Sequence, residues 1–202
     1  MSVRKSIPEK EGVYFITFTC KDWIPLFKIC NAYDAVYKWF DILKQSGHYI
    51  IGYSIMPHHL HAVIAFCNTG KRINTIVSNG KRFIAYDLIN RLQQQNEIKI
   101  LANLQQVLNN TEKKEGKLHS VFEPSFDWKE CRTEKFIQQK LDYMHWNPCK
   151  GKRLVELSEQ YPYSSAKFYL TGEQGIYPVI NFMELRDIDL TKGIMEKNRN
   201  VP

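Results

Sequence analysis

The chain has 202 residues, of which 44% are hydrophobic and 24% charged, and this balance excludes a disordered or fibrous protein. Its 28 lysines and arginines outnumber its 21 acidic residues, so the formal net charge of +7 suits a polyanionic partner. Many soluble proteins are equally basic. The charge therefore supports a nucleic-acid function only together with a site.

The five cysteines are scattered and include no Cys-x-x-Cys pair, which argues against a disulfide framework and against a zinc ribbon. The start of the chain lacks an apolar signal core, and no run approaches the ~18 apolar residues that would cross a membrane. We therefore expect a soluble, cytoplasmic protein without a membrane partner.

Residues 13–20 are mostly β-branched and aromatic, which predicts a central strand. Apolar residues then recur at spacings of three and four from Tyr33 to Leu43, and this pattern predicts an amphipathic helix. Asn31 is a candidate N-cap for it, and Gly47 a candidate stop. The aromatic side chains of this helix lie on the stripe that should face the sheet, so we interpret them as core.

Residues 49–56 and 59–66 predict two further strands, joined by a short turn. Side chains alternate along a strand, so His59 and His61 share one face while Leu60 and its neighbours in alternation share the other. Two imidazoles side by side on a rigid strand can form a divalent-metal site. An isolated His-x-His also fits two exposed histidines on a half-buried strand, and the pattern alone leaves both interpretations open.

Apolar residues from Ile73 to Leu88 predict a second helix, with Lys81 and Arg82 on or near its other sides. These basic residues form either a solvated face or a nucleic-acid contact. The long stretch from about 97 to 130 is interpreted as an insertion, with a short helix in its apolar part at 98–108.

Three aromatic residues near the end of that insertion, Phe122, Phe126 and Trp128, could stack on bases or pack the insertion. We favour packing, because buried aromatics outnumber stacking platforms.

A third helix is predicted by apolar residues at helical spacing from Phe136 to Met144, and Pro148 should end it near Asn147. Tyr143 and Asn147 are four residues apart, so they should share a face and present a phenol and an amide oxygen together. Each also has an ordinary explanation, the tyrosine as a packed aromatic and the asparagine as a C-terminal cap.

The predicted order is strand, helix, strand, strand, helix and a further helix, which indicates an α+β fold. Helices should cover one face of an antiparallel sheet and leave the other to the histidines and the tyrosine-bearing helix. We expect a single domain over residues 1–202, with a core at about 11–172 and a peripheral C-terminal tail at about 173–202.

The segments Met56-Pro57-His58-His59-Leu60-His61 and Tyr143-Met144-His145-Trp146-Asn147-Pro148 together resemble the REP-associated tyrosine transposases, a branch of the single-tyrosine HUH transposases. The likeness extends to Lys81-Arg82-Phe83 and to Tyr161-Pro162-Tyr163-Ser164-Ser165-Ala166. It covers most of residues 11–172.

The resemblance implies a ferredoxin-like core and a metal-dependent nuclease and strand transferase for single-stranded or hairpin DNA. It implies that His59 and His61 bind the metal, that Asn147 is the third ligand, and that Tyr143 is the nucleophile of a 5′-phosphotyrosine intermediate. It also implies a homodimer. The family usually has asparagine where this chain has His58, and its connection before the tyrosine helix is shorter.

The mixed set of two imidazoles and one amide oxygen suits Mg²⁺ or Mn²⁺, and zinc remains open from ligand type alone. A rim position is expected for His58, where it would contact phosphate or tune the site, or would simply be an exposed turn residue. The candidate DNA contacts are His58, Lys81, Arg82, Lys140, Lys150, Lys152 and Arg153.

Three other functions compete with this interpretation. A domesticated, catalytically idle DNA-hairpin binder would have lost the metal ligands or the nucleophile, whereas this sequence retains all four groups. A histidine-triad nucleotide hydrolase would need a third alternating histidine, and position 63 is Val63. A purely structural protein–protein module is the remaining alternative. Transposase-like DNA chemistry is the favoured interpretation.

Overall fold

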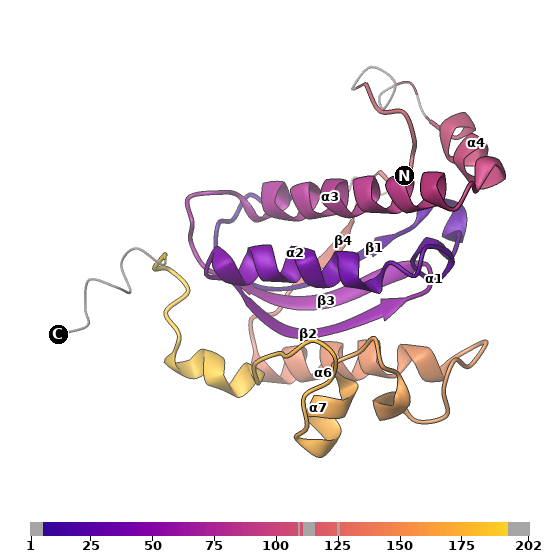
Figure 1. The fold of residues 1–202 in the computed structure, drawn as a ribbon. Helices are drawn as coiled ribbons and strands as arrows, with labels where there is room; N and C mark the ends of the chain where they lie inside the picture. The colour runs from indigo at the N-terminus through magenta and orange to yellow at the C-terminus, as the bar shows by residue number, and fades with distance from the viewer. Residues whose placement is uncertain (1–5, 109, 111–115, 125, 194–202) are drawn as a thin grey trace.

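The computed structural model of the chain describes residues 6–108, 110, 116–124 and 126–193. Its centre is an antiparallel sheet of four strands in the order β2-β3-β1-β4 (Figure 1). The strands are β1 (Gly12–Thr19), β2 (Tyr49–Met56), β3 (His59–Phe66) and β4 (Asp127–Glu130). Because β3 pairs with both β1 and β2, the strand that carries the histidine pair is held on both sides.

The first three strands form where they were predicted, whereas β4 was not predicted. It lies inside the stretch 97–130 that we expected to be an insertion, and it pairs with β1 from Tyr14 opposite Glu130 to Thr17 opposite Asp127. A half-exposed strand at a sheet edge needs no apolar run, so the sequence Asp-Trp-Lys-Glu gave no strand signal. The inserted connection therefore ends before β4.

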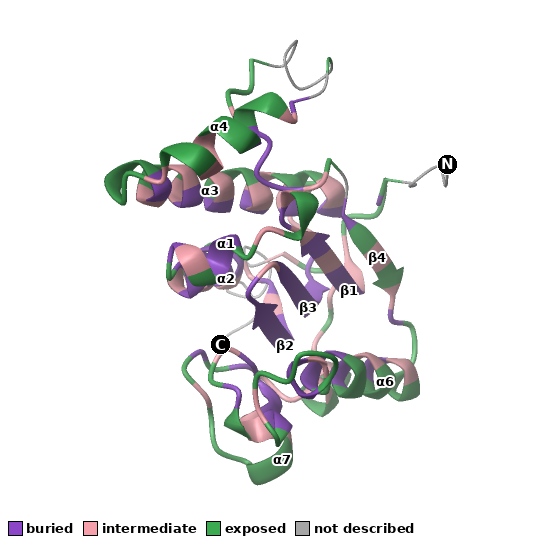
Figure 2. Ribbon diagram, turned by 90° about the vertical axis from the view of Figure 1, so that its right-hand side faces the viewer, coloured by how far each residue is buried: buried purple, intermediate pink, exposed green. Residues whose placement is uncertain are grey.

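Two helices, α2 (Tyr33–Gln45) and α3 (Ile73–Gln94), cover one face of the sheet (Figures 1 and 2). Their apolar stripes pack on Leu60 and the strand residues that share its face, as the alternation along β3 predicts. Helix α2 has Ala32 as its N-cap instead of the predicted Asn31, and Gly47 follows its end with φ 87°. The predicted amphipathic helix and its stop are thus confirmed, and its N-cap lies one residue later than predicted.

The opposite face of the sheet is covered by α6 (Glu134–His145), the helix that carries Tyr143 (Figure 2). The Thr133 side chain caps its start by accepting a hydrogen bond from the Phe136 N–H. Its buried residues, including Leu141 and Met144, pack on the residues of the sheet that face away from α2 and α3. The prediction of helices on one face and the tyrosine helix on the other is confirmed.

Gly52 permits α6 to approach the sheet closely. It lies in β2 at a register shift between Ile50 and Gly52, where one strand residue is extra. A Cβ at this position would collide with Leu141 Cδ2 and would lie 2.6 Å from Met144 Cε. A side chain at this position therefore requires Leu141, Met144 or the helix itself to move.

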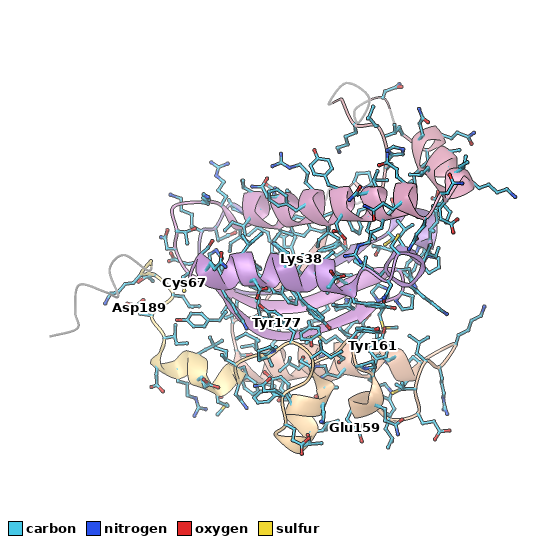
Figure 3. The ribbon with its side chains drawn as sticks, in the orientation of Figure 1. Lys38, Cys67, Glu159, Tyr161, Tyr177 and Asp189 are labelled. Atoms are coloured by element: carbon cyan, nitrogen blue, oxygen red, sulfur yellow. The ribbon has the colours of Figure 1, made fainter. Side chains whose placement is uncertain are left out.

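The outer edge of β2 is covered by the chain's own segment after α6. Its Ile55 N–H donates to the Tyr163 carbonyl at 2.9 Å, and the Ser165 N–H donates to the Tyr53 carbonyl at 3.0 Å. Tyr161, which is marked in Figure 3, donates its hydroxyl proton to the Ile55 carbonyl at 2.8 Å. The motif at 161–166 is therefore structural, because it supplies the partner that an edge strand otherwise lacks.

Residues 173–193 pack on the core, which corrects the expectation of a peripheral tail. The side chain of Tyr177 is buried beside α2 and donates a hydrogen bond to Asp41 at 2.8 Å (Figure 3). The 3₁₀ helix η4 (Phe182–Asp187) lies against α6, where Arg186 and Glu134 form two hydrogen bonds of 2.6 and 2.7 Å. The rest of the predicted tail, 194–202, lies outside the described residues.

The connections contain short helices. The predicted helix at 98–108 is confirmed as α4 (Ile98–Gln106), and Phe122 and Phe126 are buried in the core, so the packing interpretation is confirmed for them. The remaining elements are α1 (Leu26–Ile29), α7 (Ala166–Thr171) and the 3₁₀ helices η1 (Lys21–Trp23), η2 (Asn147–Cys149) and η3 (Ser158–Gln160). Among the described residues, every helix is too short or too polar to traverse a bilayer.

Candidate functional site

The two histidines of β3 meet over the sheet face that α6 covers. The Nε2 atoms of His59 and His61 are 3.0 Å apart. Thr17, the partner of His61 across the β1–β3 ladder, places its hydroxyl oxygen 2.6 Å from His61 Nδ1. This contact fixes the ring and directs its Nε2 toward His59, as a supporting hydrogen bond does for histidines that bind a metal.

Both imidazoles are neutral at physiological pH. Burial lowers the pKa of His59 to about 3, with a smaller contribution from nearby His58. Burial also places the pKa of His61 well below its usual value, and the repulsion that a second proton on the neighbouring histidines or the charge of Lys140 would cause lowers it further. A neutral imidazole offers the lone pair that a metal ion needs.

The donor atoms fit a divalent cation. Two neutral Nε2 atoms at 3.0 Å must share either a proton or a cation, because two lone pairs facing each other repel. With bonds of about 2.1 Å, such a pair subtends about 90° at an ion, the angle between neighbouring ligands of an octahedron. Among the described residues, no group of three His, Cys, Asp or Glu side chains gathers to hold a metal.

Asn147 is the residue that the sequence analysis predicts as a third ligand. Helix α6 ends at His145, so Asn147 lies at the start of η2, just beyond the α-helical face predicted for it and Tyr143. Its Nδ2 is buried, and no described residue hydrogen-bonds to it. The same holds for His59 Nδ1. Buried polar atoms without a partner are rare. Because an amide nitrogen only donates, Asn147 could bind a cation through its side-chain oxygen alone.

Tyr143 reaches the histidine pair from α6. Its ring centroid is 5.5 Å from that of His61 and 6.0 Å from that of Phe15, and Phe15 in turn stacks on His61 at 5.4 Å. The tyrosine is nevertheless 46% exposed, so the phenol is open to a substrate while one side of its ring is fixed. A single chain thus brings His59, His61 and Tyr143 together.

Two lysines lie beside the tyrosine. Lys140 Nζ, one turn earlier on α6, is 5.8 Å from the Tyr143 ring centroid, and Lys150 Nζ is 5.4 Å from it. Lys152 and Arg153 follow in the same exposed loop. These four basic residues, all predicted as DNA contacts, thus belong to α6 and to the exposed segment that follows it.

The predicted contacts on α3 lie apart from this cluster. Lys81 donates a hydrogen bond to the Glu123 carbonyl at 2.8 Å, and the Arg82 guanidinium lies over Phe83. Helix α3, which carries both residues, covers the face of the sheet opposite the histidine pair (Figure 1).

At the rim of the site, His58 has the position that its place in the turn predicts. It is half-buried, and its ring centroid is 4.7 Å from that of His59 and 5.0 Å from that of Trp23. Burial lowers its pKa from the usual value.

Sequence patterns did not point to Trp23, Thr17 or Phe15. Thr17 and Phe15 contact His61 only because of the β1–β3 register, which the sequence does not specify. Trp23 lies in a short loop with an irregular backbone, and an isolated tryptophan there gives no signal.

Comparison with known proteins shows the fold. No model of a protein family and no curated protein matches this sequence. Among solved structures, the chain is similar to a REP-associated tyrosine transposase bound to a REP hairpin, with a TM-score of 0.56 and 16% identity over 95% of this chain and 98% of that one. A presumed transposase from Deinococcus radiodurans R1 also matches, with a TM-score of 0.41 and 14% identity over 66% of this chain and 88% of that one.

Proposed function

We propose that this protein is a transposase-like, metal-dependent endonuclease and strand transferase for single-stranded DNA. The observation that carries the proposal is the convergence of the two histidine Nε2 atoms at 3.0 Å beside an exposed tyrosine, whose ring lies 5.5 Å from His61. The fold similarity to a REP-associated tyrosine transposase supports it independently.

His59, His61 and the side-chain oxygen of Asn147 would hold a Mg²⁺ or Mn²⁺ ion. When bound, the ion would withdraw charge from a phosphodiester and hold it in place. The protein supplies neutral ligands and a fixed ring orientation through Thr17. It also excludes water from one side of the pair, since Phe15 stacks on His61.

Tyr143 would carry out the cleavage. Its phenolic oxygen attacks phosphorus, the bond from phosphorus to the 3′-oxygen breaks, and the products are a 5′-phosphotyrosine and a free 3′-hydroxyl. The phenol releases its proton to solvent as the leaving oxygen takes one up. A free phenol has a pKa of about 10, so reaching its anion at neutral pH costs ~4 kcal/mol, and nearby positive charge must offset this cost.

Lys140 and Lys150 contribute that charge. Both ammonium groups lie within 6 Å of the Tyr143 ring centroid, at 5.8 and 5.4 Å, so a phosphodiester brought to the tyrosine enters a positive region. Reversal of the reaction by another 3′-hydroxyl would join two strands without ATP, because the phosphotyrosine preserves the ester bond.

Hairpin DNA is the substrate class that we propose. Basic residues at and after the end of α6 would contact phosphates, so binding should weaken as the salt concentration rises. His58 at the rim is a further candidate for a phosphate contact. The tyrosine and the histidine pair meet within one chain, and the homodimer remains a separate prediction.

The test is formation of a covalent adduct. The protein is incubated with Mn²⁺ and a pool of 5′- and 3′-labelled single-stranded hairpins whose flanking nucleotides are randomised, and the mixture is separated on a denaturing gel. We expect a protein–DNA adduct that keeps the label of the 3′ fragment, with the modified peptide containing Tyr143. Salt-sensitive binding without an adduct would instead indicate an idle hairpin-binding protein. Neither binding nor an adduct would refute both functions.

A further inference from the structure

Trp23 is an exposed tryptophan with an unusual backbone. It follows the end of β1 in η1, and 63% of its side chain is exposed. Asp22 and Trp23 have φ values of 51° and 58°, in the left-handed region that bulky residues rarely adopt. Such a conformation is unfavourable by itself and persists only where the surroundings impose it.

Backbone hydrogen bonds impose it here. The Cys20 N–H donates to the His58 carbonyl at 2.8 Å, and the Phe27 N–H donates to the Pro57 carbonyl at 3.0 Å. Both bonds tie the loop to the turn that precedes the histidine pair. Within the loop, the Trp23 N–H donates to the Cys20 carbonyl at 3.1 Å. The backbone that carries the indole is therefore held in place, although most of the indole faces solvent.

That place is beside His59. The indole is T-shaped to the His59 ring with centroids 5.9 Å apart, and its centroid is 5.0 Å from that of His58. Tyr143 contacts the pair through the other histidine, at 5.5 Å from His61. The order of neighbouring rings is thus Trp23, His59, His61 and Tyr143, with the two exposed aromatics at the two ends.

We propose that Trp23 stacks on the base of the nucleotide immediately 5′ of the scissile phosphate. This inference rests on the proposed function. In an in-line displacement the attacking and leaving oxygens lie on opposite sides of phosphorus. If the phosphate lies at the histidine pair and the phenol attacks from the His61 end, the leaving 3′-oxygen and its nucleotide lie toward the His59 end, where Trp23 is exposed. A fixed, exposed indole is a suitable surface for a base.

The stacking would select the phosphodiester that is cut. A strand held only by phosphate contacts can slide past the tyrosine, whereas a base stacked on Trp23 sets its register. Trp23 is therefore a positioning residue and not a catalytic one. A purely structural indole would cover His59 without contacting DNA, and the test must distinguish these two roles.

The test is a double-mutant cycle between the indole and the base. In Tyr143→Phe protein, which cannot form the adduct, DNA affinity is measured by fluorescence anisotropy with and without Mn²⁺. The ligand is the hairpin strand cut by the wild type, either intact or with one abasic nucleotide at each position around the cut. Trp23→Leu, which keeps an apolar cover, is compared with Trp23→Phe and with Tyr86→Leu, a change at a 66% exposed aromatic on α3.

We expect Trp23→Leu to weaken binding to intact DNA about 5- to 150-fold, the range for loss of one base stack. It should cause no further loss when the nucleotide 5′ of the cut is abasic. Trp23→Phe should recover most of the affinity, and Tyr86→Leu should have no effect.

Two results would overturn the inference while leaving the proposed function intact. One is that the losses from Trp23→Leu and from an abasic site multiply at every position. The other is that the two are coupled only at the nucleotide 3′ of the cut. A wild-type protein that neither binds nor cuts the hairpin pool would refute the proposed function itself, and the inference with it.

Discussion

Replacing Gly52 by alanine should slow cleavage by displacing the tyrosine helix. The added Cβ would collide with Leu141 and would lie 2.6 Å from Met144 Cε. Carbon atoms pack at about 3.5–4.0 Å, so the two side chains must retreat by about 1 Å. Leu141 and Met144 are fully buried and have little room to rotate, so we expect α6 to retreat with them. Tyr143 lies between these two residues in sequence, so the retreat moves the phenol relative to His61.

The expected cost has two parts. Overpacking is unfavourable by about 1–3 kcal/mol, and the loss of glycine's backbone freedom in the unfolded chain offsets about 0.5–1 kcal/mol of it. The free energy of unfolding should therefore fall by up to about 2.5 kcal/mol in urea titrations. A displacement of ~1 Å at a reacting group can reduce the rate about 100-fold, so single-turnover cleavage should slow by about 10- to 100-fold. Binding of Tyr143→Phe protein to the same hairpin should not change when Gly52→Ala is added.

Gly80→Ala is the matched control. Its Cβ would collide with the indole of Trp39, so it also overpacks the core, but between α3 and α2 on the other face of the sheet. We expect a loss of stability with an unchanged cleavage rate. The reasoning is refuted if Gly52→Ala is destabilised yet cleaves at the wild-type rate, or if Gly80→Ala slows cleavage equally.

Three further predictions concern the site and the stability of the fold. Tyr143→Phe should fold and bind DNA but form no adduct on a denaturing gel, and cleavage by this variant would exclude Tyr143 as the nucleophile. Asn147→Ala should keep the nucleophile and regain part of its activity in excess Mn²⁺. A mixture of Tyr143→Phe and His61→Ala chains should stay inactive in the same assay, because the two rings lie 5.5 Å apart within one chain, and recovered activity would show that two copies share each site. His48 is buried, and its Nδ1 accepts a hydrogen bond from the Cys67 N–H at 3.1 Å. Burial lowers the pKa of His48 to about 4. Between pH ~6.5 and 4, His48 is therefore protonated in the unfolded chain but not in the folded one. The free energy of unfolding should therefore decrease as the pH is lowered through that window, and between pH 7 and 5 it should decrease by about 2 kcal/mol more in the wild type than in His48→Asn. Equal pH dependence of the two proteins in urea titrations would contradict this.

The sequence predicts best the elements in which the hydrophobic pattern and the flanking turn residues agree. The strands at 49–56 and 59–66 were predicted to the residue, because alternation and a short turn fix both ends, and the same alternation placed His59 and His61 on one face. Strand β4 and the packing of Tyr177 were missed. Both depend on contacts with distant segments, since a polar edge strand and an irregular stretch have no periodicity of their own.

The candidate site was predicted in part for the same reason. Tyr143 and the histidines belong to short motifs on regular elements. Thr17 depends on strand register, and the position of Trp23 depends on a left-handed loop backbone that only its hydrogen bonds with the neighbouring turn explain. The positions of Lys81 and Arg82 on the far face of the sheet likewise follow from the packing of α3, which the sequence did not orient relative to the site.

The covered edge of β2 has a consequence for how copies of this chain can associate. A bare edge strand is the usual template on which a second molecule adds its own strand, in ordered complexes and in aggregates alike. Here residues 163 and 165 already occupy the backbone groups of Tyr53 and Ile55. The other edge, β4, is four residues long and carries charged side chains, which disfavours strand addition. A homodimer of this protein should therefore form through side chains of helices and loops, and its interface should leave the sheet at four strands in each copy.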